Sequence, residues 1–176
     1  MSFMKKHQFL NVDFHSTVKL SAATQKELIL WLNWASPVVE RLIKNKILPG
    51  FKGKTVSVSL LICGDARIKK LNSDYRNKNK VTDVLSFPSI ENLREQSKFI
   101  DSDLFLGDLA ICHPQTLRQS KEFSIGYLDE FIHLFFHGLL HLMGFDHEIS
   151  KKEEKLMQDW EQKALAEFSQ IKKGSR

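Results

Sequence analysis

The sequence predicts an α/β (α+β) fold, in which one small mixed sheet of about four strands packs with about six helices. Short β-branched segments alternate with longer segments whose apolar residues recur at helical spacing. The 176 residues suffice for one core, and no repeat or Gly/Ser linker divides them, so we expect a single domain over residues 1–176. The composition, 42% hydrophobic and 27% charged, is that of an ordinary globular chain. The pattern leaves the strand order open.

The N-terminal third is expected to form two strands and two helices. Ser21 has the residue type of a helix N-cap, and the apolar spacing after it continues to Ala35. Pro37 is expected to start a second helix that runs to Leu48, because proline fits a first helical turn. Residues 49–54 are expected to form a loop. The strands of this part are predicted at residues 9–14 and 55–63.

The middle of the chain alternates polar and apolar segments. Residues 64–72 are expected to form a short helix, and residues 74–80 a polar loop. Residues 84–87 form a short apolar strand that Pro88 ends, which is typical of an edge strand. Residues 89–103 have no clear period and are expected to be irregular.

The C-terminal part is expected to hold one strand and three helices. Residues 104–113 read as a strand, and residues 113–123 as a helix with a proline near its start. Residues 125–144 are apolar on nearly all sides, which indicates a buried helix. Ser150 and Glu153 have the spacing of a capping box for the last helix. Its inward stripe is Leu156, Met157, Trp160, Ala164 and Phe168. The N-terminal residues and the tail at 169–176 are expected to fray.

Charge and cysteine content narrow the class of protein. The net charge of +5 permits an anionic partner without requiring one. The two cysteines, Cys63 and Cys112, lie in apolar segments and are expected to be buried, reduced thiols. The first residues hold no apolar run long enough for a signal peptide, and no segment approaches the ~20 apolar residues of a membrane span. We therefore expect a soluble cytoplasmic protein with no membrane partner.

The segment FFHGLLHLMGFDHE, residues 135–148, carries the strongest functional signal. His137 and His141 are four residues apart and can present two imidazoles on one helical face. Gly144 allows the chain to turn back after the helix, so that His147 can supply a third ligand. The spacing HxxxHxxGxxH is that of the metzincins, with the glutamate absent. Three imidazoles suit one Zn²⁺ ion, less selectively nickel, cobalt or copper, and leave a position open for chemistry.

Several neighbours of the histidines have alternative roles. His133 is expected to be structural or to support a ligand histidine through a hydrogen bond. Its alternative roles are a fourth metal ligand and a substrate contact. Asp146 either orients a ligand histidine or shapes the turn. Gly138 stands where a HExxH metalloprotease has its general-base glutamate, which weighs against peptide hydrolysis. A different carboxylate could serve as the general base, and the candidates by residue type alone are Asp83, Asp108 and Glu148. Each has the residue type of a cap, turn or surface position as well.

Basic residues are concentrated between residues 65 and 80. Six basic residues minus two acidic ones leave +4 in this segment, out of +5 for the chain. Such a run is usually a solvated face, but beside a metal it would suit a phosphodiester better than a neutral peptide bond. The basic residues are Arg67, Lys69, Lys70, Arg76, Lys78 and Lys80.

Three motifs together resemble a known family. HGLLHLMGFDH resembles the signature of the YbeY family of bacterial endoribonucleases, and LNSDYRNKNKVTDVLSFP and LGDLAI resemble two further blocks in the family's order. The resemblance spans residues 71–148 and extends to the preceding strand and the last helix. Phe145 stands where the family frequently has tyrosine. The N-terminal residues and the basic tail look like modest extensions.

The resemblance implies a zinc-dependent endoribonuclease specific for single strands. It would act in late maturation of the 3′ end of small-subunit ribosomal RNA and in ribosome quality control. By motif match, His137, His141 and His147 would be the metal ligands, and Arg76 the catalytic arginine near the scissile phosphate. Ribosomal RNA and particles would be partners, together with ribosomal or GTPase assembly proteins, whereas the oligomeric state is open. The rival readings are a zinc metalloprotease-like hydrolase and a non-enzymatic, metal-stabilised ribosome assembly factor.

Overall fold

A four-stranded mixed sheet lies at the centre of the computed structural model, which describes residues 9–48, 51, 53, 55–91, 93–96 and 103–175. The strand order is β1-β2-β4-β3. β1, β2 and β4 are mutually parallel, and β3 pairs antiparallel with β4 at the edge of the sheet, as its sequence predicted. The strands are β1 Leu10–Ser16, β2 Val56–Cys63, β3 Val84–Pro88 and β4 Leu104–Cys112.

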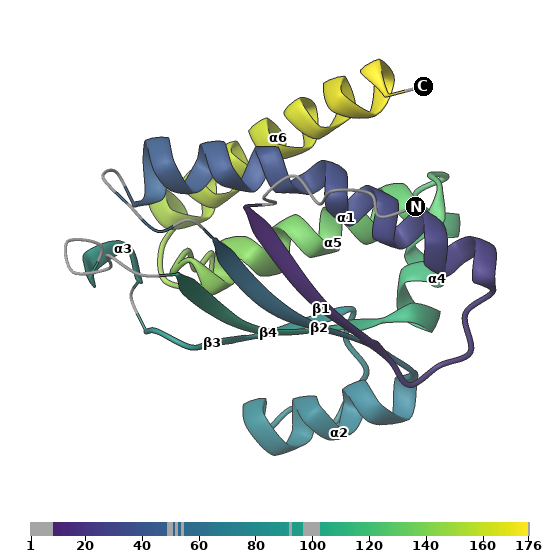
Figure 1. The fold of residues 1–176 in the computed structure, drawn as a ribbon. Coiled ribbons are helices and arrows are strands. Elements are labelled where there is room, and N and C mark those ends of the chain that lie inside the picture. Colours follow the sequence, from purple (N-terminus) through teal and green to yellow (C-terminus); the bar gives the residue numbers. More distant parts are fainter. Residues whose placement is uncertain are drawn as a thin grey trace.

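Helices cover the two faces of the sheet unequally (Figure 1). α1, α5 and α6 lie on one side and α2 on the other, while α4 follows β4 at the end of the sheet. Within the described residues five helices span ten residues or more and α3 is a single turn, so the α+β class is confirmed. The helices are α1 Ala22–Leu42, α2 Asp65–Arg76, α3 Leu93–Gln96, α4 His113–Glu122, α5 Tyr127–Leu142 and α6 Lys151–Gly174. None of the described helices is long and apolar enough to cross a membrane.

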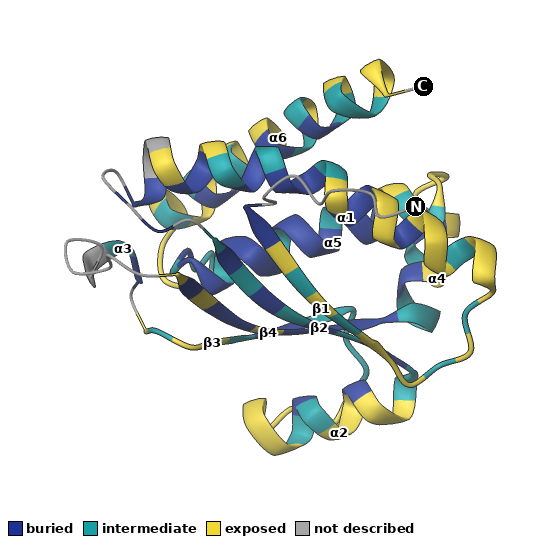
Figure 2. Cartoon of the chain, in the orientation of Figure 1, coloured by how far each residue is buried: buried dark blue, intermediate teal, exposed yellow. Residues whose placement is uncertain are grey.

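The main core lies between the sheet and α1, α5 and α6, where the buried residues of these elements face one another (Figure 2). Phe131, Phe135 and Phe136 of α5 are among its largest fully buried side chains. A smaller apolar cluster lies under α2 and contains Cys63 and Cys112, which are buried and reduced as expected. Burial raises the pKa of Cys63 to about 11 and that of Cys112 to about 12, so both thiols stay protonated.

The prediction of two helices before residue 49 was wrong. α1 runs without interruption through Pro37 and continues as a π-helical segment, Ile43–Ile47. The side chains around the proline are buried in the core, and the Ser36 hydroxyl accepts a hydrogen bond from the Leu10 amide at 3.0 Å. Packing along the whole apolar face therefore outweighs the local helix-breaking tendency of proline.

The polar loop predicted at residues 74–80 was partly wrong. α2 extends through Arg76, and Asn77 ends it in the left-handed conformation with φ 54°. Only Ile68 and Asn72 of this helix are buried, so its polar composition reflects an exposed helix that touches the sheet along a narrow stripe. Within the segment expected to be irregular, α3 forms one turn, whereas residues 97–102 lie outside the described part of the chain.

The C-terminal tail is more ordered than the sequence suggested. α6 continues to Gly174, because Lys172 forms an ion pair of 2.8 Å with Asp129 of α5 and lies over the Trp31 ring. The Ser150 hydroxyl caps the start of α6 by accepting from the Glu153 amide. Residues 1–8, four positions of the predicted loop (49, 50, 52 and 54) and residue 176 lie outside the described residues.

α5 packs tightly against the sheet at Gly138. A Cβ atom at this position would lie 2.8 Å from Cδ2 of Leu109 and 3.3 Å from both Cγ2 of Val84 and Oγ of Ser86. The Ser86 hydroxyl also donates to the Gly138 carbonyl oxygen at 3.3 Å. Position 138 therefore faces the sheet, and a side chain there would require Leu109 to shift.

Substitution Gly138→Ala is expected to lower the free energy of unfolding by about 1 kcal/mol. Overpacking costs ~1–3 kcal/mol because buried Leu109 has little space to move, and this exceeds the ~1 kcal/mol that alanine gains in a helix. Chemical denaturation would measure the change. Gly174→Ala is the matched control, since no atom lies within 4 Å of its added Cβ. If Gly138→Ala were as stable as the parent protein, the contact would not limit this position.

Candidate metal centre and its cleft

Two of the three signature histidines lie in the last turns of α5. His137 and His141 are one turn apart, and their ring centroids are 4.8 Å apart. Both are partly exposed, while most of the residues around them in the helix are buried. The helical spacing thus presents two imidazoles at the one side of α5 that reaches the surface, as the sequence predicted.

The end of α5 brings the third histidine beside them. Gly144 adopts a φ of +91°, and its amide donates to the His141 carbonyl. The Phe145 amide donates to the carbonyl of Leu140, which completes a Schellman motif. The chain turns back, and the His147 ring lies 5.5 Å from that of His137 and 5.0 Å from that of His141.

The ligand atoms of this histidine cluster (His137, His141 and His147) all lie within 4.8 Å of one another, so the cluster could hold a metal ion. The Nε2 atoms of His137 and His141 are 3.2 Å apart. Two ligands at about 2.0–2.1 Å from one ion at a tetrahedral angle would be about 3.3 Å apart, which agrees with this separation. The donor set, and the spacing of this pair, therefore fit a single tetrahedral ion.

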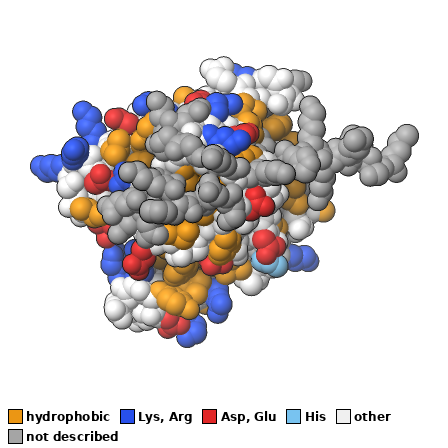
Figure 3. Space-filling view, turned by 60° about the vertical axis from the view of Figure 1, so that its left-hand side comes forward, with side chains coloured by type: hydrophobic (Ala, Val, Ile, Leu, Met, Phe, Trp, Pro, Cys, Tyr) orange, Lys and Arg blue, Asp and Glu red, His pale blue; other side chains and the backbone are white. Residues whose placement is uncertain are grey.

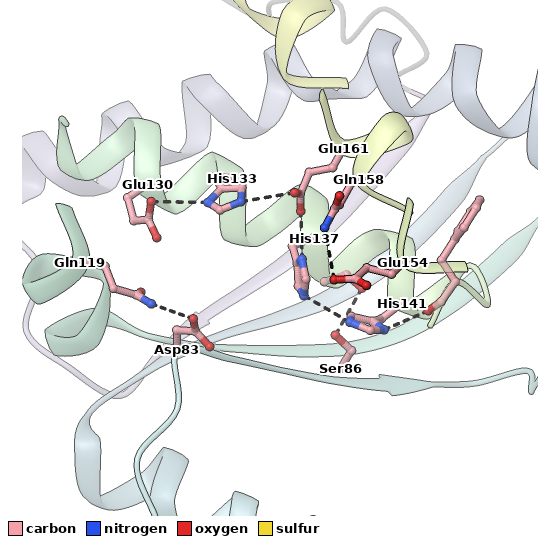
Figure 4. Close-up of polar contacts among 12 residues, drawn as sticks. Asp83, Ser86, Gln119, Glu130, His133, His137, His141, Glu154, Gln158 and Glu161 are labelled. Carbon is pink, nitrogen blue, oxygen red and sulfur yellow. Dashed lines mark hydrogen bonds and ion pairs between the residues drawn. The ribbon is translucent and has the colours of Figure 1, made fainter. Parts of the chain in front are cut away.

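Two of these imidazoles are oriented by hydrogen bonds at Nδ1, the ring nitrogen that does not face the other histidines (Figure 4). Nδ1 of His141 donates to the Phe145 carbonyl at 2.9 Å, and Nδ1 of His137 contacts Oε1 of Glu161 at the same distance. Because a carbonyl and an ionised carboxylate only accept, both Nδ1 atoms carry the proton. Each Nε2 lone pair is then free to bind a metal.

His141 is held in the neutral form. Burial, and then the neighbouring imidazoles of His137 and His147, lower the pKa of His141 to about 4. At neutral pH this ring has no proton to lose before it can act as a ligand.

Glu161 of α6 is the site residue that the sequence reasoning missed. Its carboxylate bridges His137 and His133, with the latter contact 3.5 Å from Nε2 of His133. Burial would raise the pKa of Glu161, but its hydrogen bonds to His133 and His137 lower the pKa to about 2, so it stays ionised. On the other side of His133, Nδ1 lies 3.4 Å from the buried carboxyl group of Glu130. His133 thus supports the site from behind and is not part of the histidine cluster.

A signal for Glu161 was present in the sequence. Residue 161 lies four positions after Met157 and three before Ala164, on the inward stripe of the last helix. An acidic residue on an otherwise apolar stripe requires a buried partner. The identity of that partner depends on how α6 packs against α5, which the helical period alone does not define.

The histidine cluster opens into a cleft of about 470 Å³ along the outer edge of β3. Three of the six basic residues singled out in the sequence line it, namely Arg76, Lys78 and Lys80. The guanidinium of Arg76 donates to the Ser86 carbonyl of β3 at 3.4 Å, and Lys78 lies 4.0 Å from Glu148 in the turn after α5. The end of α2 and the histidine turn therefore face each other across the cleft.

The other basic residues of α2 lie away from this cleft. Arg67 and Lys69 are exposed, and Lys70 forms an ion pair with Asp74 one turn further along the helix. These three residues are part of the solvated face of α2.

The acidic residues near the motifs have mostly structural roles. The Asp83 carboxylate accepts from the Val84 amide and from Gln119, and so fixes the start of β3. Asp108 lies in β4 on the α2 side of the sheet, in a different hollow. The Asp146 carboxylate accepts from the Glu148 amide and shapes the turn. Glu148 itself is exposed at the mouth of the cleft.

Fold and site together define a class: an α+β protein with a zincin-like histidine cluster at the edge of a mixed sheet. A sequence model described as Endoribonuclease YbeY matches residues 20–169. The chain therefore belongs to the endoribonuclease YbeY family, as its three motifs had suggested.

Individual relatives agree with this assignment. A protein named Endoribonuclease YbeY from Caldicellulosiruptor bescii is 37% identical over 134 residues, covering 74% of this chain and 84% of its own. The protein of the same name from Sulfurihydrogenibium sp. is 33% identical and covers 80% and 91% of the two chains. That from Thermodesulfovibrio yellowstonii is 42% identical over 62% of this chain and 65% of its own.

A solved structure supports the fold. The solution structure of TM1509 from Thermotoga maritima aligns with a TM-score of 0.59 over 94% of this chain and 93% of that one. The two sequences are 22% identical, so the likeness concerns the fold alone.

One divalent transition-metal ion is expected to bind per chain. After chelation and dialysis, titration with zinc in a calorimeter should give a stoichiometry of one, and His141→Ala should weaken binding by ~100-fold or more because it removes one of three ligands. His15→Ala is the control, since that histidine is exposed on β1. Equal zinc binding by the two variants would contradict the site.

Glu161→Gln is expected to weaken zinc binding by ~10- to 100-fold with the stoichiometry unchanged. The amide is neutral and polarises the His137 ring less than a carboxylate does, so the ligand is less basic and less well oriented. Competition with a chromophoric chelator would measure the affinity. Asp159→Asn removes an exposed carboxylate from the same helix and should leave the affinity unchanged. Equal affinities for both variants would show that Glu161 does not support the metal ligand.

Proposed function

We propose that this chain is a zinc-dependent endoribonuclease that cleaves single-stranded RNA. The observation that carries the proposal is the shared cleft, in which the histidine cluster and Arg76 line the same space along β3. Membership of the endoribonuclease YbeY family supports the choice of RNA as substrate. Imidazole donors at this spacing favour Zn²⁺, although nickel, cobalt and copper share the preference.

The histidine cluster, Glu161 and Arg76 have different roles in this proposal. His137, His141 and His147 would hold the ion, the first two through the Nε2 atoms that their Nδ1 hydrogen bonds leave free. Glu161 keeps His137 in the required tautomer. When bound, zinc supplies Lewis acidity toward a phosphate oxygen and makes a nearby water more acidic. Arg76 neutralises negative charge that develops on the phosphate, for which its planar guanidinium is suited.

The site lacks two features that a peptidase of this kind would use. Gly138 occupies the place of the general-base glutamate, and a side chain there would press against side chains of the sheet. In addition, Arg76 already donates to the outward-facing Ser86 carbonyl of the edge strand. A peptide that added to this edge would have to displace that hydrogen bond.

The biological role follows from the same proposal. Ribosomal RNA is the expected substrate, with cleavage in late maturation of the 3′ end of the small-subunit RNA and in ribosome quality control. The partners would be ribosomal particles, together with ribosomal or GTPase assembly proteins, in the cytoplasm. The net charge of +5 favours association with such anionic particles.

Arg76→Ala is expected to slow RNA cleavage by ~10²- to 10³-fold while RNA binding weakens much less, because the guanidinium acts mainly on charge that develops during the reaction. The substrate is a labelled fragment from the 3′ end of small-subunit ribosomal RNA, and all proteins carry one zinc per chain. Arg67→Ala is the matched control, as Arg67 is an exposed arginine of the same helix outside the cleft.

The possible outcomes separate the proposal from its rivals. Slow cleavage by Arg76→Ala alone supports an endoribonuclease. Equal cleavage by both variants and the parent protein would mean that the activity belongs to another site or a contaminant. If neither the parent protein nor the variants cleave but all bind RNA, a non-enzymatic assembly factor becomes the better reading.

A further inference from the structure

A second hollow lies on the opposite side of β3 from the metal cleft. It has a volume of about 520 Å³ and lies between the end of α2 and the open face of the sheet. Leu71 and Tyr75 of α2, Phe87 of β3 and Leu61 of β2 supply its apolar walls. Nothing in the roles of the histidine cluster or Arg76 accounts for this hollow.

Tyr75 is the most exposed aromatic residue that borders it. Its ring has an exposed fraction of 67%, although it packs edge-on against Phe87 with ring centroids 5.1 Å apart and an interplanar angle of 68°. Exposing an aromatic ring of this size costs free energy unless something covers it. Because Phe87 holds the ring in place, little side-chain entropy would be lost when a flat ligand stacks on it.

The two hollows meet at the end of α2. Tyr75 and Arg76 are consecutive residues, as are Ser86 and Phe87 of β3, and consecutive strand residues point to opposite faces. Arg76 donates to the Ser86 backbone carbonyl at the strand edge and lines the metal cleft, while Tyr75 packs against the Phe87 ring in the second hollow. A chain lying across this edge would therefore meet the guanidinium and the aromatic ring in succession.

The charges around this edge favour a nucleic acid over a peptide. Arg76, Lys78 and Lys80 lie within a few residues of Tyr75, whereas the neighbouring Asp74 forms an ion pair with Lys70. In the lower part of the molecule, where α2 lies, Figure 3 shows Lys and Arg side chains around hydrophobic ones, with some acidic side chains among them. Asp108 of β4 is the strand partner of Phe87 and lines the hollow itself, while Asp13 lies further across the sheet on β1. The favourable path for a phosphate backbone thus follows the end of α2 and stops short of the centre of the sheet.

We propose that Tyr75, supported by Phe87, is a stacking subsite for one base of the RNA strand whose phosphate is bound at Arg76. This inference rests on the proposed function, since it assigns to the same substrate a second point of contact. Stacking on one ring tolerates any base, with purines bound better than pyrimidines because they offer a larger surface. The subsite would place a nucleotide next to the cleavage site outside the metal cleft and would favour unpaired RNA, because a paired base cannot reach the ring.

The test combines Tyr75→Ala with an abasic scan of the substrate. Each zinc-loaded protein is assayed with oligoribonucleotides in which a single abasic site is moved position by position around the cleavage site. With intact RNA, Tyr75→Ala is expected to raise KM by about 5- to 150-fold, while Tyr75→Phe retains the parent value. At one position the abasic substitution should cause the same loss in the parent protein and no further loss in Tyr75→Ala.

Phe123→Ala is the matched control, because Phe123 is a similarly exposed aromatic residue, 56%, just after α4. An unchanged KM for Tyr75→Ala, or independent effects of Tyr75→Ala and the abasic site at every position, would overturn the subsite. In the latter case a protein partner would be the better occupant of the hollow. Thermal unfolding of each variant verifies that the fold is retained.

Failure of the proposed function gives a different pattern. If the parent protein cleaves none of the RNAs, binding is followed instead by fluorescence anisotropy with the same oligoribonucleotides. A loss of affinity for Tyr75→Ala that the matching abasic site abolishes would keep the stacking subsite although the nuclease is lost. Equal affinities of Tyr75→Ala and the parent protein would contradict the stacking subsite as well as the nuclease function.

Discussion

The contact between Gly138 and the sheet is the constraint on which the rest of the site depends. A helix normally packs on a sheet through side chains, but here the α5 backbone approaches Leu109 and Ser86 so closely that a Cβ atom would overlap. This approach places the neighbouring residue His137 directly beside β3, the edge strand. The position that a zincin uses for its general-base glutamate is therefore a position where α5 packs tightly against the sheet.

The end of α5 then converts helical spacing into a three-dimensional ligand set. Gly144 permits the left-handed turn, and the same turn directs the Phe145 carbonyl to Nδ1 of His141. Glu161, which lies on α6, accepts the corresponding hydrogen bond from Nδ1 of His137. Two partly buried imidazoles would otherwise cost free energy through their unsatisfied nitrogens. These hydrogen bonds therefore stabilise the fold and also fix which nitrogens would face a bound ion.

Prediction from sequence succeeded where the signal is local. The histidine spacing, the glycine turn and the β-branched segments depend on residues within a few positions of one another, and each appears in the structure. It failed where packing between distant segments decides: α1 passes through Pro37 because its neighbours are buried, and α2 reaches Arg76 although its sequence is polar. Glu161 was missed for the same reason, since its partner, His137, lies 24 residues away.

The edge of β3 explains how one histidine cluster can serve a different substrate from that of a peptidase. An unpaired strand edge offers backbone groups that an extended peptide can use, and a zincin-like site beside it would present such a peptide to its metal. In this chain Arg76, the last residue of α2, donates to the Ser86 carbonyl at that edge. What remains accessible is a guanidinium on one side of the strand and an aromatic ring on the other. Phosphates and bases fit such a surface, whereas the backbone of a peptide would find its hydrogen-bond acceptor occupied.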